Sequence, residues 1–561
     1  VVPAKEAFLG FANSAVITVA AVLIISRGLT NSGAIERVAK YLLPKVENVT
    51  LQMGGLNIFT GALSAVMNNV GALALLMPAT INAAKKLKKS PSLFLMPLSF
   101  ASIMGGMVTL IGTPTNIIIA NLRPELMASI RPELKDVSPY TMFDFAAVGG
   151  VVALVGILFV TLIGWRLLPK DRTAKESGST LFDIEGYTSE VKVPKDSKYI
   201  GIPMPKLDLK AKEYGIQIAG IIRNKRRILA LKPSHELKSQ DILILETNPE
   251  DLDKFTHEMG FEPVGDLGKD IALLSSEDVV LIEAVVSSDS RLIGRKVSTL
   301  RLKSRYHINL LGISRQGTTI IKRLQDVVLR TGDVALLQAE EDIYRTTLSR
   351  LGLLPLAERG FSMGKRHQAW LAGLFLGTAV LLASFGVLDL TIALTAAALG
   401  MVVTNIVPLQ DLYESVDWPV IVLVGAMIPL GGALQTVGAT DLLANGILSL
   451  SSGLPIYIIL GLVMFATMTL SDVMNNVATA VVMAPVGLAI ADGLEVNPDA
   501  FLMTVAVGAS CAFLTPIGHK NNALVMGPGG YKFGDYWRMG LPLEILILFV
   551  AVPMIMIVWP L

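Results

Sequence analysis

The sequence predicts a polytopic α-helical membrane protein built from two inverted repeats, with a soluble α/β segment inserted between them. Hydrophobic residues make up 52% of the 561 residues and charged residues 17%, and the charged ones concentrate between Arg166 and His367. Apolar stretches long enough to enter a bilayer of roughly 30 Å flank that charged segment on both sides. The apolar-flanked tetrapeptide Met-Asn-Asn-Val occurs once in each flank, at residues 67–70 and 474–477.

The internal repeat extends well beyond the tetrapeptide. Residues 2–34 align without gaps with residues 407–439, and a hexapeptide that follows each Asn pair recurs as well. Three blocks in the same order indicate that the two flanks are copies of one unit. The second copy has further apolar sequence upstream, residues 370–407, with no equivalent before Val1. We therefore expect that the natural chain begins one or two helices earlier.

Charge placement orients the chain in the membrane. Basic residues leave the first repeat and enter the second, which places the insert in the cytoplasm by the positive-inside rule. Residues 51–67 and 70–84 then form a re-entrant hairpin open to the cytoplasm, because each arm is short for a full span. The corresponding hairpin, residues 455–470 and 477–491, opens to the outside. One hairpin from each face is the inverted-repeat geometry of secondary transporters.

Each repeat also contains an interrupted helix. The hexapeptide IGTPTN, residues 111–116, places Gly112 and Pro114 within an apolar segment, and Pro114 removes a backbone donor there. Its counterpart IGHKNN, residues 517–522, follows Pro516 and interrupts the second copy. The other expected membrane segments are 93–122, 143–168, 369–385, 388–407, 418–436, 501–526 and 541–559.

The Asn pairs lie at the two hairpin tips, where a turn inside the membrane leaves backbone groups without partners. Carbonyl and carboxamide oxygens suit a hard cation such as Na⁺, while helix N-termini favour an anion. Each repeat thus offers a tip and a broken helix, enough oxygen ligands for one cation apiece. The alternative is that the Asn side chains only cap the broken helices.

Two ionisable residues, Asp472 and Lys520, interrupt the apolar sequence near these motifs. A charge at the centre of a membrane helix costs at least about 2.5–3.5 kcal/mol, so each residue needs a partner or water. One interpretation pairs them with each other as a structural bridge. The other assigns Lys520 to an anionic substrate and Asp472 to a cation or a proton.

These motifs, together with the sequence CAFLTPIGHKNNALVMGPGGY, resemble the divalent-anion:sodium symporter family (DASS) of the ion transporter superfamily. The resemblance covers nearly all of residues 1–168 and 368–561. It implies a homodimeric elevator-type transporter with two Na⁺ sites and an anion bound between the hairpin tips. Where that family carries Ser-Asn-Thr at each tip, this chain has Asn-Asn-Val. The lost hydroxyls and the extra charge of Lys520 favour a compact oxyanion such as sulfate over a C4-dicarboxylate.

The resemblance assigns a binding role to specific positions in this sequence. The candidate substrate-binding residues are Asn69, Asn476, Thr113, Lys520, Val70 and Val477. The candidate sodium-binding residues are Asn68, Asn69, Gly112, Asn116, Asn475, Asn476, Gly518, Asn522 and Asp472.

The insert contains a repeat of its own, in which short β-rich runs at residues 216–222 and 308–313 precede a turn with Asp and a closing strand. The two copies resemble TrkA-C modules (RCK_C), the ligand-binding subdomains of potassium-transport regulators. This implies a nucleotide or ion as regulatory ligand, with Arg223 and Arg315 as candidate residues; the alternative is a dimerisation role. No GxGxxG fingerprint precedes them, so no dinucleotide domain is expected.

These observations predict a domain order and a function. The expected ranges are 1–168 (first membrane repeat), 169–190 (linker), 191–256 (first TrkA-C module), 257–276 (linker), 277–350 (second module), 351–367 (linker) and 368–561 (second membrane repeat). We expect sodium-coupled symport of a divalent anion in the inner or plasma membrane of a prokaryote. The partners would be a second copy of the chain, lipid and a small anionic solute, without nucleic acid and without an organic cofactor in the membrane part.

Two other functions stay open. A cation/proton antiporter of the same superfamily is favoured by Asp472 and the Asn pairs. A cation channel gated by the TrkA-C modules is the other, although the sequence has no TVGYG-like filter. An enzyme is not expected, because no acid/base or nucleophile constellation occurs in the chain.

Overall fold

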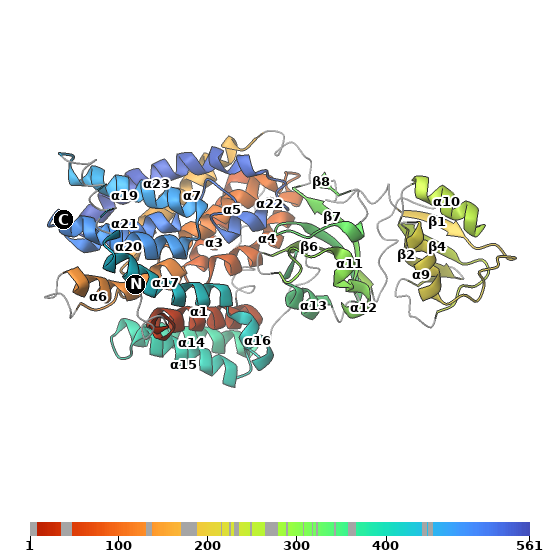
Figure 1. Ribbon diagram of the computed structural model, residues 1–561, viewed down its shortest axis with the longest axis horizontal. Helices are drawn as coiled ribbons and strands as arrows, with labels where there is room; N and C mark the ends of the chain where they lie inside the picture. The colour runs from red at the N-terminus through yellow and green to blue at the C-terminus, as the bar shows by residue number, and fades with distance from the viewer. Residues whose placement is uncertain are drawn as a thin grey trace. The chain divides into compact units, whose positions relative to one another are not determined.

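Figure 1 shows a computed structural model of the chain. It describes residues 8–34, 48–130, 137–169, 188–214, 216–223, 226–228, 235–246, 249–263, 279–287, 290–306, 308–316, 318–320, 324–340, 344–356, 366–439, 442, 446 and 453–561. Most of the three expected linkers lies outside these residues, as do the first residues of the aligned repeat. The chain divides into two compact units, one of Val1–Ala174, Glu358–Val525 and Lys532–Leu561 and the other of Lys175–Ala357 and Met526–Tyr531.

The first unit is helical. Its elements from the first repeat are η1 (Leu9–Ala12), α1 (Ser14–Asn31), α3 (Val49–Ser64), α4 (Asn69–Lys86), α5 (Ser92–Gly106), α6 (Pro114–Ile130), α7 (Ala146–Leu162) and η3 (Gly164–Leu167). The elements from the second repeat are α14 (Arg366–Ser384), α15 (Leu390–Val403), α16 (Leu409–Ser415), α17 (Trp418–Thr436), α19 (Ile456–Val473), α20 (Asn476–Gly493), α21 (Pro498–Ser510), α22 (Lys520–Met526), η7 (Phe533–Asp535) and α23 (Tyr536–Val558).

Both predicted helix–turn–helix pairs are present. Helices α3 and α4 pack against each other around a turn that ends at Asn68, and α19 and α20 do so around a turn that ends at Asn475. Three of these four helices, α3, α4 and α20, begin at an Asn cap, and Asn48 accepts hydrogen bonds from two backbone amides at the start of α3. Helix α19 begins after Pro455 without a side-chain cap. The tips therefore form because polar capping residues separate two apolar helical runs.

Both predicted helix interruptions are present as well. Helix α5 ends at Gly106 and α6 starts at Pro114, so a loop of turns, residues 107–113, occupies the position where the sequence predicted a break. In the second repeat α21 ends at Ser510 and α22 starts at Lys520. The N–H group at the first position of a helix has no partner within the helix. Pro114, which lacks this group, can therefore begin α6.

The hairpin and the broken helix of each repeat pack against each other. Helix α3 lies along α5, and α19 lies along α21. In the first pair the backbones approach so closely that a Cβ atom on Gly105 would lie 2.2 Å from the carbonyl oxygen of Gly61. Helix α6 of the first repeat also packs against α20 of the second, so the two copies share one core. This packing brings the loops of both broken helices next to the hairpin tips.

Four helical segments in the described part of the chain are long and apolar enough to cross a membrane. They are Ser14–Asn31, Ile456–Val473, Asn476–Gly493 and the continuous stretch Phe533–Val558. Shorter apolar helices accompany them, among them α5, α7 and α15. These helices are consistent with the predicted polytopic membrane protein.

The second unit contains two five-stranded antiparallel sheets with the same strand order. The first comprises β1 (Thr188–Lys192), β2 (Gln217–Arg223), β3 (Arg226–Ile228), β4 (Ile242–Glu246) and β5 (Glu262–Pro263), in the order β3-β2-β4-β1-β5, with helices α9 (Met204–Glu213) and α10 (Pro249–Met259). The second comprises β6 (Val279–Val286), β7 (Asn309–Arg315), β8 (Thr318–Thr319), β9 (Val334–Glu340) and β10 (Leu353–Pro355), in the order β8-β7-β9-β6-β10, with α11 (Val297–Leu300), α12 (Leu302–Tyr306), η6 (Leu324–Asp326) and α13 (Tyr344–Leu351). The insert therefore holds two copies of one α/β module, as its repeat predicted.

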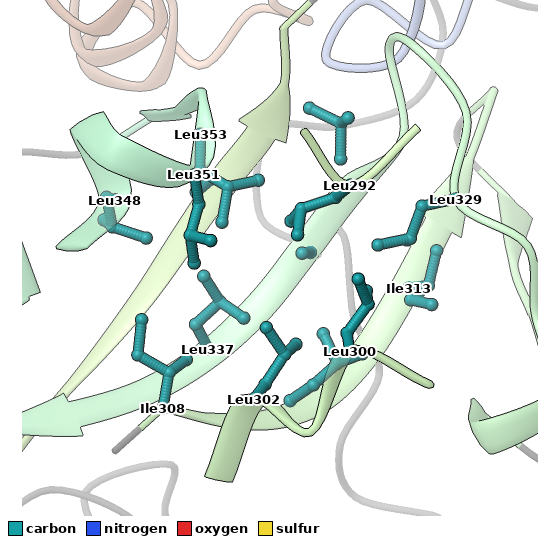
Figure 2. Close-up of a cluster of buried hydrophobic side chains, with 14 of the residues drawn as sticks. Leu292, Leu300, Leu302, Ile308, Ile313, Leu329, Leu337, Leu348, Leu351 and Leu353 are labelled. Carbon is teal, nitrogen blue, oxygen red and sulfur yellow. The ribbon is translucent and has the colours of Figure 1, made fainter. Parts of the chain in front are cut away.

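Each module has its own apolar core. Figure 2 shows that of the second module, where side chains from the sheet, such as Ile313 and Leu337, meet Leu300 and Leu302 of the short helices. A separate cluster, which includes Phe255 and Leu243, fills the first module. The register of the central strands shifts at the same place in both modules, next to Gly220 in β2 and Gly312 in β7. Shared irregularities of this kind support a common origin of the two modules.

Candidate functional site

The first Asn of each tip pair caps a helix. The side chain of Asn68 accepts a hydrogen bond from the backbone N–H of Val70 at 3.0 Å, and Asn475 accepts one from Val477 at 2.8 Å. These bonds satisfy donors at the starts of α4 and α20. For Asn68 and Asn475 the capping interpretation is therefore sufficient, and any sodium ligand they supply remains a prediction.

The second Asn of each pair is held differently. In the first repeat, the Ser64 hydroxyl lies 2.7 Å from Oδ1 of Asn69. In the second, the Ser471 hydroxyl lies 3.0 Å from Oδ1 of Asn476. Both Asn side chains are buried, at 4% and 9% exposure. A serine at the end of the first arm thus fixes the carboxamide across the tip, and capping does not explain this arrangement.

The loops of the broken helices bind the same tips. The Thr109 hydroxyl donates to the carbonyl oxygen of Ala65, and the Thr515 hydroxyl donates to that of Asp472 at 2.6 Å. These two carbonyl groups occupy equivalent positions, one residue after the serine of each tip. The loops therefore stabilise backbone groups that the turns leave outside a helix.

Two further Asn side chains hold the loops closed. Asn116 donates through Nδ2 to the carbonyl oxygens of Met107 and Thr109, at 3.3 and 3.0 Å. Asn522 donates through Nδ2 to those of Ala512 and Thr515, at 2.9 and 3.1 Å. The loop carbonyls of both repeats are therefore gathered around a buried carboxamide. Thr113 is buried beside this loop, with its hydroxyl 3.5 Å from that of Thr115.

The two repeats meet at Asn69. Its side-chain nitrogen lies 3.4 Å from Nε2 of His519, and its backbone carbonyl accepts a hydrogen bond from the side chain of Asn521 at 3.3 Å. Both partners belong to the broken helix of the second repeat. A third bond, from the Ser99 hydroxyl to Oδ1 of Asn522 at 2.8 Å, joins the same regions. The first hairpin tip thus contacts the broken helix of the second repeat. That the two hairpin tips converge around an anion stays a prediction.

Glycines leave the room that this arrangement needs. A Cβ atom on Gly106 would lie 2.2 Å from Oδ1 of Asn69, and one on Gly112 would lie 2.4 Å from the carbonyl oxygen of Gly106. In the second copy, a Cβ on Gly518 would lie 2.9 Å from the carbonyl oxygen of Ser471. The predicted sodium positions Gly112 and Gly518 therefore lie where a loop comes very close to neighbouring backbone.

Asp472 is buried, at 3% exposure, near the carboxyl group of Glu544, which belongs to no sequence motif. Oδ1 of Asp472 accepts a hydrogen bond from the backbone N–H of Leu514 at 2.9 Å. The preceding N–H, that of Phe513, donates to Oε1 of Glu544 at 3.3 Å. Two carboxyl groups in an apolar body cannot both remain ionised without a counter-charge. The pair is suited to hold either a proton or a cation.

The structure gives Lys520 a partner that the sequence did not predict. Its Nζ lies 2.5 Å from Oδ2 of Asp417, the residue before α17. Lys520 follows His519, whose ring contacts the side chain of Asn69. The positive charge of Lys520 is balanced by the carboxylate of Asp417.

Val70 and Val477 follow the tips as the resemblance requires. Val477 is buried and Val70 is partly buried. Neither offers a polar atom beyond its backbone, so the predicted role of these residues in shaping an anion site rests on their volume alone.

Arg223 and Arg315 occupy equivalent positions in the two modules and form the same bonds. The Nε and Nη2 atoms of Arg223 bind both carboxylate oxygens of the buried Asp241, at 2.8 and 2.7 Å. Those of Arg315 bind Asp333 in the same way, at 2.7 and 2.8 Å. These hydrogen bonds raise the pKa of each guanidinium above its ordinary value. The arginines thus clamp the turn before the closing strand, and this geometry favours a structural role over ligand binding.

Sequence reasoning missed Asp417, Glu544 and the two tip serines. Ser64 and Ser471 could have been found, because they occupy matching positions five residues before the second Asn of each pair. Asp417 and Glu544 could not, since both lie far along the chain from their partners and only tertiary packing brings them there.

The repeated hairpins, the broken helices and the buried polar cluster between them define a membrane transporter. The sequence matches the citrate transporter family (CitMHS) over residues 1–463 and 438–561, and the chain belongs to that family. It is 30% identical to an uncharacterized transporter of Synechocystis sp., covering 99% of this chain and 90% of the relative, and 30% identical to the uncharacterized transporter YfbS of Escherichia coli, covering 99% and 92%. It is 20% identical to sodium/sulfate cotransporter 2 of Chlamydomonas reinhardtii, covering 98% and 84%.

The prediction of a transporter is therefore confirmed at the level of class. The family and these relatives are named as transporters and not as enzymes, in agreement with the expectation from the sequence. The citrate transporter family is related to the divalent-anion:sodium symporters that the motifs resemble, and both belong to the ion transporter superfamily.

Proposed function

We propose that the protein is a sodium-coupled secondary symporter for a small divalent anion, with sulfate favoured and a C4-dicarboxylate as the other candidate. The observation that carries this proposal is the duplicated arrangement of Ser, tip Asn and loop carbonyls in the two repeats. Two related sites of this kind suit two cations, because both gather neutral oxygen atoms in a buried setting. The similarity to a protein named as a sodium/sulfate cotransporter supports the same assignment.

Buried oxygens without a hydrogen bond support a cation near the second tip. In the described part of the chain, Oδ2 of Asp472 and Oγ1 of Thr479, both on the second hairpin, are buried and form no hydrogen bond. Leaving a buried polar atom unsatisfied costs about 1–3 kcal/mol, so a bound ion would recover part of that free energy. Asp472 also supplies the negative charge that a Na⁺ ion requires.

The order of binding follows from the same oxygens. Na⁺ would bind first and order the two tips, because without a cation the gathered carbonyls repel an approaching anion. The anion would then bind between the starts of α4 and α20, where the helix dipoles favour negative charge. Lys520 would add a full positive charge, which a dianion needs for compensation inside the membrane.

The wider assignments belong to the same proposal. The protein would work as an elevator-type homodimer in the inner or plasma membrane of a prokaryote, with the insert in the cytoplasm. The two α/β modules would act as TrkA-C regulators that bind a nucleotide or an ion, or as dimerisation modules. The matching strand orders of the two sheets support the view that the modules are copies of one unit.

Uptake into proteoliposomes tests the function directly. Purified protein is reconstituted, and uptake of labelled sulfate, succinate and citrate is measured with and without an inward Na⁺ gradient. We expect saturable sulfate uptake that requires the Na⁺ gradient. Citrate is included because the family bears its name. Equal uptake with and without the Na⁺ gradient would refute sodium coupling. Faster uptake of succinate or citrate than of sulfate would refute the assignment of sulfate.

The buried carboxyl pair favours one alternative, a cation/proton antiporter. Asp472 and Glu544 bind successive backbone amides, and a pair of this kind can take up and release one proton. Proton movement driven by Na⁺ in the absence of any added anion would decide for this function. An obligatory anion requirement in the same liposomes would decide against it.

A further inference from the structure

Lys520 and Asp417 come from different parts of the second repeat. Lys520 is the first residue of α22, and Asp417 lies directly before α17, a helix that packs against α20, η1 and α1. Their charged atoms are 2.5 Å apart, and the side chains are only 29% and 17% exposed. Oδ1 of Asp417 lies 3.4 Å from the backbone N–H of Val420. The ion pair is therefore a defined contact between two helices and not an encounter of mobile surface side chains.

The position of this ion pair matters because of its neighbours. His519, adjacent to Lys520, contacts the side chain of Asn69, and Asn521, the next residue, binds the backbone carbonyl of Asn69. Lys520 therefore lies between two residues that contact the first hairpin tip. The proposed function assigns its ammonium group to the anionic substrate, and the carboxylate of Asp417 already forms an ion pair with that group.

We propose that Asp417 is an internal counter-anion that occupies Lys520 in the absence of substrate and is displaced when the anion binds. The inference rests on the proposed function and extends it with a residue that sets anion affinity and specificity. A charge in an apolar surrounding needs a counter-charge, so the carboxylate of Asp417 beside Lys520 stabilises the empty state. A dianion beside the Asp417 carboxylate would experience strong repulsion in a medium of low dielectric constant, so the two compete for Lys520.

Competition of this kind also disfavours weakly charged solutes. A ligand gains contact with Lys520 only if its attraction to the ammonium group exceeds that of a carboxylate already in place. A dianion meets this condition more easily than a monoanion or a neutral molecule. Asp417 would therefore reject abundant monoanions at the expense of affinity for the true substrate.

The test compares variants of the full-length protein in proteoliposomes, with Na⁺-driven uptake of labelled sulfate and with succinate and citrate as further probes. Asp417→Asn should lower the KM for the transported anion about 3- to 10-fold, because the competitor loses its charge, and should increase inhibition by a monoanion such as acetate. Asp417→Glu keeps the charge and should leave KM close to the wild-type value. Lys520→Ala should raise KM at least 10-fold, and Asp417→Asn in that background should give no further change.

The matched control is Asp411→Asn on α16. Asp411 forms another partly buried ion pair, with Arg27 of the first repeat at 3.6 Å, so its variant removes the same charge without affecting Lys520 directly. We expect no change in KM. Thermal unfolding of each purified variant establishes that the protein is folded.

Three outcomes separate the possibilities. A folded Asp417→Asn protein with unchanged or raised KM would overturn the inference while the proposed function stands. A decrease of KM that persists in the Lys520→Ala background would also overturn it, since the effect would then not act through Lys520. A wild-type protein that carries none of the three anions would overturn the proposed function, and the inference with it.

Discussion

At the scale of single residues, the two Asn residues of each tip have different tasks. Asn68 and Asn475 cap helices, whereas Asn69 and Asn476 are each fixed by a serine, and Asn69 also contacts His519 of the other repeat. Replacing a cap costs about 1 kcal/mol of stability, while removing a carboxamide from a binding site removes a ligand. Stability and transport should therefore respond separately to substitutions at these positions.

Asn69→Ala and Asn476→Ala should each abolish Na⁺-driven uptake while the protein remains folded. Each substitution removes a buried carboxamide that the proposed cation and anion sites both use. Asn48→Ala is the matched control, because it removes only the cap of α3. We expect the control to retain uptake and lose about 1 kcal/mol of stability. Wild-type-like uptake by both tip variants would refute the site assignment.

Gly106→Ala should inactivate transport with little loss of folded protein. The added methyl group would lie 2.2 Å from Oδ1 of Asn69, so the Asn69 side chain would have to move and lose its hydrogen bond with Ser64. Gly150→Ala in α7 is the control, since a Cβ atom there meets nothing within 4 Å. Uptake assays combined with thermal unfolding check the prediction. Equal activity of the two variants would show that the position of Asn69 does not matter.

At the scale of elements, each repeat and each module is stabilised by a small set of bonds that occurs twice. The Thr hydroxyl on the tip carbonyl and the Asn side chain across the loop recur in both halves of the membrane unit. The Arg–Asp clamp recurs in both modules of the insert. Equivalent bonds in both copies indicate which contacts each fold depends on.

Arg223→Ala should destabilise the first module by roughly 2 kcal/mol, because the buried Asp241 loses both of its charged hydrogen bonds. Lys238→Ala is the control: it lies in the same turn, removes the same charge and is exposed. Hydrogen–deuterium exchange of the full-length protein should show faster exchange in β2 and β4 for the arginine variant alone. If both variants exchange alike, the clamp contributes no stability. A loss of regulatory ligand binding with unchanged exchange would instead support the ligand role of Arg223.

At the scale of the whole molecule, the chain combines a helical transporter with two α/β modules in its middle. The chain divides into two compact units, and the modules of the insert each have an apolar core of their own. The insert lies between the two homologous halves of the membrane part. Because the insert lies between the two repeats, each hairpin remains on the same side of the insert as the broken helix of its own repeat. The transporter should therefore assemble its site without the insert.

Deletion of residues 172–365, with a short linker in their place, should leave basal Na⁺-driven uptake. The residues proposed to bind substrate and sodium all lie outside this range, so the deletion removes regulation only. Uptake by the deleted and complete proteins is compared at equal amounts of reconstituted, folded protein. A folded but inactive protein would show that the insert is required for transport itself.

The sequence by itself determined the helices, the hairpins and the class of protein. Apolar runs separated by Asn, Gly and Pro specify where helices begin and end, because capping and proline chemistry act over a few residues. The duplicated motifs also locate Asn69, Asn476 and the two broken helices. These features are local or repeated, and both kinds of signal are visible in a linear sequence.

Only the tertiary structure decided which charges meet. Asp417 lies 103 positions from Lys520 along the chain. The carboxyl groups of Glu544 and Asp472 accept hydrogen bonds from two successive backbone amides, those of Phe513 and Leu514. No local pattern encodes such pairs, because a carboxylate and an ammonium group attract whichever partner the packing of apolar helices places beside them. The sequence left a ligand role open for Arg223 and Arg315. Their buried partners, Asp241 and Asp333, are brought beside them only when the strands of each sheet pair.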